Sequence, residues 1–246
     1  MSRRPARSAA DRPVAPAGGP VVVTAPSDRE MILRMLTLLV EPLQRSIPGS
    51  AEVVLHDLSR IPDSIVAVAG SVTGRAIGSP ATDKLLAEAA SGQMRTDVGY
   101  ETRMPGGREL RSTTIVVPDA DGTPVAALCI NCDVTMWRAV HEIAANMLPE
   151  APIAVRPDDE PAAPGPARET FAHDIDELAG QLLRQALAAS DAPVHLMQKR
   201  HKLAVVEDLK GRGFFMLKES VETAAAALGV TRFTIYNYLN EIDQVQ

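Results

Sequence analysis

AAAALGVTRFTIYNYLNEI, residues 224–242, lies near the end of the chain and contains two helix patterns separated by Gly229. Before this glycine, Ala225 and Leu228 fall on one helical face, and the small alanine allows a second helix to cross closely. Glycine adopts the left-handed conformation of the turn without steric cost. The stretch therefore predicts a helix-turn-helix over residues 220–241.

After the glycine, Val230, Ile235 and Tyr238 are the expected inward positions, and the other side of the second helix is polar and aromatic. In a helix-turn-helix, the second helix reaches base edges in the major groove. Arginine pairs with guanine, asparagine with adenine, and an aromatic ring contacts a thymine methyl group or a sugar. The predicted DNA-binding residues are Thr231, which also caps the helix, Arg232, Phe233, Thr234, Tyr236, Asn237 and Asn240, together with Lys202.

The charge of the chain is unevenly distributed. Residues 194–246 hold seven lysines and arginines against six acids, whereas the whole chain carries a formal charge of -6. The negative total argues against indiscriminate binding to nucleic acid or anionic membrane, but it permits a local binding face for double-stranded operator DNA. The basic stretch QKRHK, residues 198–202, supplies candidate phosphate contacts. The alternative is a plain helical hairpin whose aromatic side chains pack in a core.

Length and composition restrict the remaining choices. The 246 residues suffice for one large domain or two small ones. No apolar run approaches the ~20 residues of a membrane helix, and residues 1–26 lack the apolar core of a secretory signal, so we expect a disordered tail there. Two cysteines give no disulfide framework, which favours the cytoplasm.

Periodicity before residue 149 predicts a small α+β domain over residues 27–148. Ser27 and Glu30 have the spacing of a capping box, and Pro42 is expected to end or kink the helix that follows. The other predicted helices of this domain cover residues 81–90 and 137–148, and the predicted strands cover 51–58, 64–70, 98–104, 109–119 and 123–134.

The second half of the chain begins with a segment that cannot form a core. Residues 149–168 contain many prolines, alanines and acids, which predicts a linker. Residues 169–246 form a helical DNA-binding domain in this interpretation. Its predicted helices cover residues 168–189, 195–213, 218–229 and 231–242.

Catalytic, metal and redox chemistry find little support. Cys129 and Cys132 form a C-x-x-C, but on a strand residues three apart face opposite ways, and zinc needs four ligands. His56 and Asp57 are adjacent on a strand and cannot pair with each other. The glycines of residues 70–80 are not followed by Gly-Lys-Ser/Thr, so this is no nucleotide-triphosphate loop. We expect no enzyme, no cofactor and no bound metal.

Polar side chains on otherwise apolar strands indicate a pocket for a small polar ligand, because buried polar groups need partners. Arg75 suits a ligand that carries a carboxylate. For His56, a simple buried hydrogen bond and, less readily, haem ligation remain open. The predicted ligand-binding residues are His56, Thr73, Arg75, Ser112, Thr114 and Asn131.

The motifs LHDL (55–58), VTGRAIGSPATD (72–83), STTI (112–115) and ALCINCD (127–133) resemble the PAS-type domain of the YheO-like family. The end of the chain resembles the helix-turn-helix of the DauR-like regulators. The resemblance covers residues 29–137 and 175–243; the long proline-rich linker and Cys132 depart from the family pattern.

The resemblance implies a bacterial transcription regulator with a small-molecule sensor in front and a DNA-binding domain behind. We expect it to bind a palindromic operator as a homodimer or a higher homo-oligomer. The best-known type is similar to a repressor of amino-acid catabolism. Two alternatives remain: a PAS-type module whose last helices dock a protein partner, and a haem or redox sensor.

Overall fold

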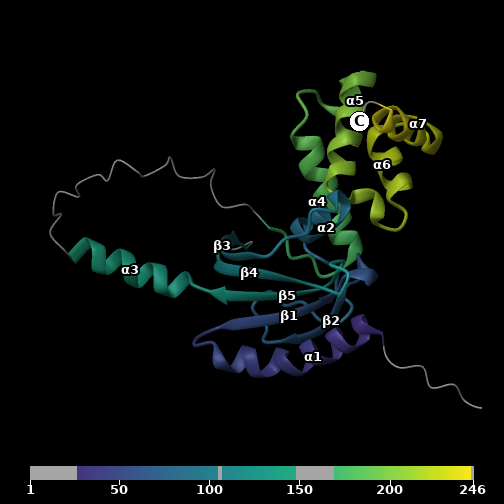
Figure 1. Ribbon diagram of the computed structural model, residues 1–246. Helices are drawn as coiled ribbons and strands as arrows, with labels where there is room; N and C mark the ends of the chain where they lie inside the picture. Colours follow the sequence, from purple (N-terminus) through teal and green to yellow (C-terminus); the bar gives the residue numbers. More distant parts are fainter. Residues whose placement is uncertain (1–26, 105–106, 148–168, 245–246) are drawn as a thin grey trace, which may run out of the picture.

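A computed structural model describes residues 27–104, 107–147 and 169–244. The described chain forms an antiparallel sheet with helices, followed by a bundle of helices (Figure 1). This arrangement confirms the predicted α+β fold with an all-helical C-terminal unit. We call the sheet with α1, α2 and α3 the front unit, and the helices from α4 onward the C-terminal unit.

The five strands of the front unit have the order β2-β1-β5-β4-β3, and every neighbouring pair is antiparallel. Side chains alternate between the two faces of such a sheet. One face is apolar and packs on α1, and the other face is polar. The strands are β1 (Ala51–Asp57), β2 (Ile65–Ala69), β3 (Asp97–Arg103), β4 (Glu109–Pro118) and β5 (Pro124–Asp133).

Helix α1 (Asp28–Ser46) begins at the predicted capping box, in which both hydrogen bonds between Ser27 and Glu30 are present. Its inner side packs on the apolar sheet face, where Val40 is buried. Of the two predicted effects of Pro42, to end or to kink the helix, the first is wrong, because α1 continues to Ser46. Pro42 lies on the exposed side of α1, where water can bind the carbonyl group that proline leaves unpaired.

Helix α3 (Thr135–Met147) runs away from the end of β5, and no described element covers it (Figure 1). Its base is attached to the sheet by ion pairs of Arg138 with Glu101 and with Glu109, the latter at 2.9 Å. None of the residues of α3 is buried.

The C-terminal unit consists of α4 (Ile175–Ala188), α5 (Lys199–Gly211), α6 (Ser220–Leu228) and α7 (Arg232–Asp243), with short 3-10 turns between them at Val194–Leu196 and Phe214–Met216. The front unit has a similar turn at Leu58–Arg60. The predicted helix over 168–189 is shorter than expected. Asp174 caps α4 through the amide of Glu177, and residues 169–173 lie extended against the front unit. The predicted linker, residues 149–168, lies outside the described residues, as does the predicted tail.

Helix α2 (Asp83–Ser91) connects the two units. Its Leu86 is fully buried in the core of the C-terminal unit, together with residues such as Leu209 and Phe214. Gly213 has φ 75°, and a Cβ atom there would lie 2.8 Å from the Leu86 carbonyl oxygen. Only glycine permits this close approach, so the C-terminal unit is packed directly onto α2.

Candidate DNA-binding surface and ligand site

The turn between α6 and α7 has the geometry of a helix-turn-helix. Gly229 is in the left-handed region with φ 60°, and the amide of Val230 donates to the Ala225 carbonyl at 3.0 Å. The Thr231 hydroxyl accepts from the Thr234 amide at 3.2 Å, which satisfies an amide that would otherwise be unpaired at the start of α7. The hydroxyl oxygens of Thr231 and Thr234 are also 2.9 Å apart, so the two side chains form a hydrogen bond at the start of α7.

The inward positions of this motif are those that the sequence predicted. Ala225 is 5% exposed, which leaves space for α7 to cross α6 closely. Val230 is half-buried against the same core. The remaining inward residues are buried: Ala224, Leu228, Ile235, Tyr238 and Ile242.

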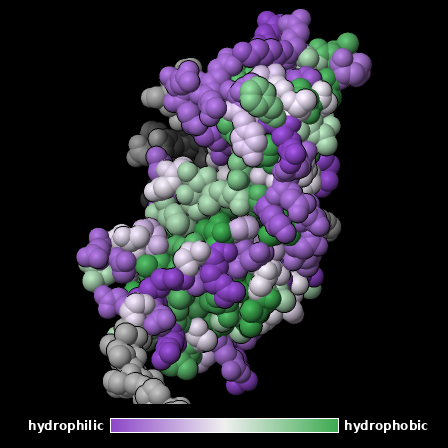
Figure 2. Space-filling model, turned by 90° about the vertical axis from the view of Figure 1, so that its right-hand side faces the viewer, coloured by the Kyte–Doolittle hydropathy of each residue, from purple (hydrophilic) through white to green (hydrophobic). Residues whose placement is uncertain are grey.

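The outward face of α7 is largely exposed. Phe233 is 73% exposed and Tyr236 is 54% exposed, and the first turn of α7 contains no acid. Hydrophilic residues predominate over the C-terminal helices in the upper part of the surface shown in Figure 2. The exposed members of the predicted set are Thr231, Arg232, Phe233, Tyr236, Asn237 and Asn240, whereas Thr234 is half-buried.

Arg232 is not isolated on this face. Its Nη1 atom lies 2.8 Å from Oε1 of Glu222, which belongs to α6. Sequence periodicity does not reveal this pair, because the two residues lie on different helices. An arginine held in this way keeps one orientation before DNA arrives, but the carboxylate also competes with phosphate and guanine for the guanidinium group.

The cations of the basic stretch at the start of α5 differ in whether they form ion pairs. Lys199 forms an ion pair with Glu241 of α7 at 2.8 Å and thereby fastens α7 to α5. Arg200 and Lys202 form no ion pair with any residue in the described part of the chain. These two cations therefore remain available for phosphate groups.

The six predicted ligand-binding residues are brought together by the sheet, on the face opposite α1. Four of them point from β1, β4 and β5, and the other two lie in the loop after β2. The register places Ser112 beside Asn131. All six are at most 5% exposed: His56, Thr73, Arg75, Ser112, Thr114 and Asn131.

Glu52 is a member of this face that the sequence analysis missed. It is fully buried and accepts hydrogen bonds from the Thr73 hydroxyl at 2.5 Å and from the Thr73 amide at 3.0 Å. Arg75 donates to the Thr73 hydroxyl and lies 3.8 Å from the Glu52 carboxylate. The period of two in β1, which places Glu52 on the same side as His56, was the signal that would have found it.

Three nitrogen atoms on this face are buried without a hydrogen-bond partner among the residues that the structure describes: Nε2 of His56, Nη1 of Arg75 and Nδ2 of Asn131. Burial, together with the charge of Arg75, lowers the pKa of His56 to about 3, so the imidazole is neutral. Its Nδ1 lies 2.8 Å from the Ser64 hydroxyl. Buried polar atoms are normally paired, so unpaired ones of this kind indicate a place where a ligand with acceptor atoms or water binds.

Neighbouring groups fit no redox or metal chemistry. Cys129 lies 3.7 Å from the Thr114 hydroxyl on the same face, and burial raises the pKa of its thiol to about 11, which disfavours the reactive thiolate. Cys132, three residues later on β5, is also a free thiol. Asp57 pairs with Arg29 at 2.5 Å and not with His56. Within residues 27–104, 107–147 and 169–244, no group of three or more His, Cys, Asp or Glu is placed to hold a metal.

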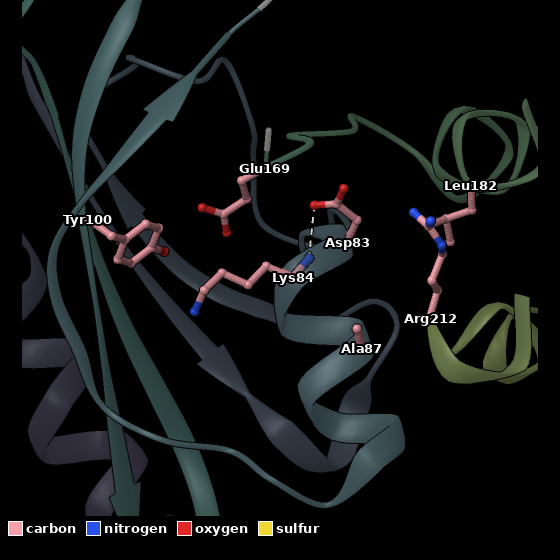
Figure 3. Close-up of a pocket in the computed structure, with 7 residues that line it drawn as sticks. All are labelled: Asp83, Lys84, Ala87, Tyr100, Glu169, Leu182 and Arg212. Atoms are coloured by element: carbon pink, nitrogen blue, oxygen red, sulfur yellow. Dashed lines mark hydrogen bonds between the residues drawn. The ribbon is translucent and has the colours of Figure 1, made fainter. Parts of the chain in front are cut away.

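Two pockets flank the segment that precedes α4. One, of about 270 Å³, has walls from both units: Lys84 and Tyr100 lie on the side of the front unit, and Leu182 and Arg212 reach in from the C-terminal helices (Figure 3). The other, of about 550 Å³, is lined by residues that include Arg103, Phe171 and Arg184. Glu169 lines both pockets.

A sheet domain with a buried polar face, joined to a helix-turn-helix whose second helix exposes arginine and asparagine, defines a DNA-binding regulator with a PAS domain. Residues 27–149 match the family model of the YheO-like PAS domain, and residues 179–240 match an HTH domain model. The chain belongs to the family of YheO-like PAS-domain proteins with a C-terminal helix-turn-helix.

Similar proteins cover nearly the same length. YheO of Escherichia coli (strain K12) is 25% identical over 215 residues, which are 85% of this chain and 84% of YheO. A Haemophilus influenzae protein is 24% identical over 219 residues, or 88% and 94% of the two chains. Transcriptional regulator DauR of Pseudomonas aeruginosa is 26% identical over 194 residues, or 79% and 86%. No solved structure matches. No helix among the described residues is long and apolar enough to span a membrane.

Proposed function

We propose that this regulator is a cytoplasmic repressor that binds a palindromic operator as a homodimer and changes its DNA binding when a small metabolite enters the front unit. The observation that carries the proposal is the outward face of α7, where Arg232 at the start and Asn237 in the middle of the helix are exposed, with Asn240 one turn further on. Such a helix contacts base edges with its N-terminal half. The likeness to a protein named as a transcriptional regulator supports the same conclusion.

The experiment is recovery of genomic fragments bound to the full-length protein, followed by gel shifts on the operator so found. Arg232→Ala and Asn237→Ala should each weaken specific binding by about 5- to 150-fold, because each removes a base contact. Circular dichroism should stay unchanged. Lys218→Ala, which removes an exposed cation outside the helix-turn-helix, is the control. Unchanged operator binding by both variants would favour the alternative in which α7 docks a protein partner through Phe233 and Tyr236.

The proposed sensing function rests on the polar face of the sheet. Three unpaired nitrogen atoms, on His56, Arg75 and Asn131, are suited to a ligand that supplies acceptor oxygens. The resemblance to repressors of amino-acid catabolism favours a metabolite related to amino acids. Asn131→Leu should abolish stabilisation by such a metabolite and leave the secondary structure intact, as thermal melts in its presence and absence would show.

The proposed dimer contact uses α1 and α3 from each copy. Helix α3 has 13 residues and buries none of them, whereas isolated helices of about 12–15 residues are marginal in water. Its exposed residues Met136, Val140, Ile143 and Met147 follow the spacing of four, three and four that a helix–helix seam requires. A covering helix is therefore needed for α3 to be stable.

Helix α1 also carries exposed apolar residues. In addition to its buried side, it exposes Met31, Met35 and Leu38, again with spacings of four and three residues. Trp137 at the base of α3 lies beside Gly49, just after the end of α1. Together α1 and α3 hold nine of the fifteen large apolar residues that the described chain exposes. A second copy fits this surface because an isologous dimer uses the same patch twice and matches a palindromic operator.

A further inference from the structure

Residues 169–173 join α4 to the undescribed linker, yet they pack on the front unit. Phe171 is 7% exposed and clusters with Val72 and Leu110 of the front unit. The guanidinium carbon of Arg75 lies 5.0 Å from the centre of the Phe171 ring. The amide of Thr170 donates to the Asp83 carboxylate at 2.7 Å. The segment that precedes α4 therefore packs on the front unit through both side-chain and backbone contacts.

The central contact of this insertion is the Glu169 carboxylate. Its Oε1 accepts a hydrogen bond from the Thr82 hydroxyl at 2.7 Å, and its Oε2 accepts one from the Thr102 hydroxyl at 3.4 Å. In Figure 3 it lies between Tyr100 and Asp83, above the side chain of Lys84. Hydroxyl donors and a nearby cation are what a protein supplies to bind a small carboxylate.

Burying this carboxylate is costly. Glu169 is 8% exposed, and burial raises the pKa of its carboxyl group, although the hydrogen bond from Thr82 and the charge of Arg75 oppose the shift. A charge in such a place is weak evidence for stability, since apolar residues would serve packing as well. A buried carboxylate that packing does not require is expected at a functional position.

The position is also accessible to a competitor. Glu169 forms part of the wall of both pockets, of about 270 and 550 Å³, so a small molecule can reach its side chain from either pocket. Arg75 lies between residues 169–173 and the polar sheet face. It contacts Phe171 on one side, and its unpaired Nη1 lies on the polar sheet face.

We propose that Glu169 occupies the subsite for the carboxylate of the effector, and that the effector displaces it. Displacement detaches residues 169–173 from the front unit. These residues lead directly into α4, whose Leu182 lies in the core with Leu86 of α2. Their release alters how the helix-turn-helix is held on the sensor. The inference deepens the proposed function, but its carboxylate subsite does not depend on DNA binding.

The test of the subsite is chemical rescue of full-length Glu169→Ala by propionate, a small carboxylate with one carbon more than the fragment that the substitution removes. We expect propionate at tens of millimolar to raise the Tm of the variant by about 2–4 °C, while wild type at matched ionic strength is unaffected. Propionamide, which lacks the charge, should have no effect. Asp176→Ala removes an exposed carboxylate of α4 and should respond like wild type. Equal responses of wild type and Glu169→Ala, or none in either, would overturn the subsite.

Release of the segment is measured by hydrogen exchange. In wild type, the Thr170 amide is hydrogen-bonded to Asp83, so the peptide around residues 169–173 should exchange slowly. In Glu169→Ala and Glu169→Gln it should exchange at least about ten-fold faster, with or without propionate. Protection equal to that of wild type in both variants would show that Glu169 does not hold the segment. Either failure leaves operator binding intact, so it is distinguishable from failure of the regulator function.

Discussion

Arg232 at the start of α7 and Glu222 on α6 form an ion pair across the turn, with Nη1 and Oε1 at 2.8 Å. The arrangement places a carboxylate beside a candidate base contact. It both orients the arginine and repels the phosphate groups that approach it. If Arg232 contacts DNA as proposed, we expect the pair to lower the affinity of the surface for DNA and to sharpen its discrimination between sequences, relative to an unpaired arginine.

Glu222→Gln should strengthen binding to DNA of any sequence by about two- to five-fold, because a negative charge is removed from the face that meets phosphates. The ratio of operator to random-DNA affinity should fall. Competition gel shifts with both duplexes measure this. Glu207→Gln, an exposed acid on α5, is the matched control. If Glu222→Gln weakens operator binding instead, the carboxylate contributes to the contact by orienting Arg232.

Lys202→Ala should weaken binding to operator and random DNA alike. A lysine that contacts a phosphate releases about one counterion, so the slope of log K against log salt should decrease in magnitude by about one. Titrations at several salt concentrations measure the slope. Lys199→Ala offers a comparison, because Lys199 is engaged with Glu241. An unchanged slope in Lys202→Ala would place this lysine outside the DNA contact.

Ala225→Leu should destabilise the C-terminal unit by about 1–3 kcal/mol, because it adds bulk where α6 and α7 cross. Ala225 is 5% exposed, whereas the next residue, Ala226, lies on the exposed side of α6. Ala226→Leu should therefore leave the stability nearly unchanged. Urea unfolding followed by circular dichroism compares the two variants. Equal stabilities would mean that the crossing is looser than the burial of Ala225 indicates.

Leu38→Glu and Ile143→Glu should each convert the dimer to a monomer, because each places a charge in the apolar surface of α1 and α3. Leu38 is 76% exposed and Ile143 is 62% exposed in the single chain, so neither change disturbs the fold of the monomer. Light scattering after gel filtration measures the mass. Val98→Glu, on the exposed side of β3 at 70%, is the control. A wild-type monomer, or variants that remain dimers, would contradict the proposed contact.

His56 should make the front unit sensitive to acid. Its pKa is about 3 in the fold and 6.5 as the ordinary value, so the unfolded chain takes up a proton below pH 6.5 that the folded chain refuses until about pH 3. Stability is therefore complete above pH 6.5 and falls as the pH decreases, by about 2 kcal/mol at pH 5.

Unfolding curves at pH 7 and pH 5 test this dependence on wild type and His56→Gln. The variant should lose less stability between the two pH values than wild type, by about 2 kcal/mol. His141→Gln changes an exposed histidine of α3 and should behave like wild type. A His56→Gln variant with the full acid sensitivity of wild type would show that other groups cause it.

The sequence by itself determined those features that depend on neighbouring residues. Gly229 specified the turn because only glycine adopts its conformation freely, and Ser27 with Glu30 specified the start of α1. The period of α7 separated its buried side, with Ile235, from its exposed side, with Asn237. Alternation along the strands likewise indicated the polar side chains of the candidate ligand site.

Only the tertiary structure decided which distant groups meet. Glu169 was expected to begin the DNA-binding domain, but it binds Thr82, 87 residues earlier in the chain. Leu86 was expected in the front domain and lies in the core of the C-terminal unit, and Glu222 was found beside Arg232 only because α6 and α7 cross. Local periodicity encodes which side of an element is buried, but not against which partner, because that choice depends on how all the apolar faces of the chain are covered together.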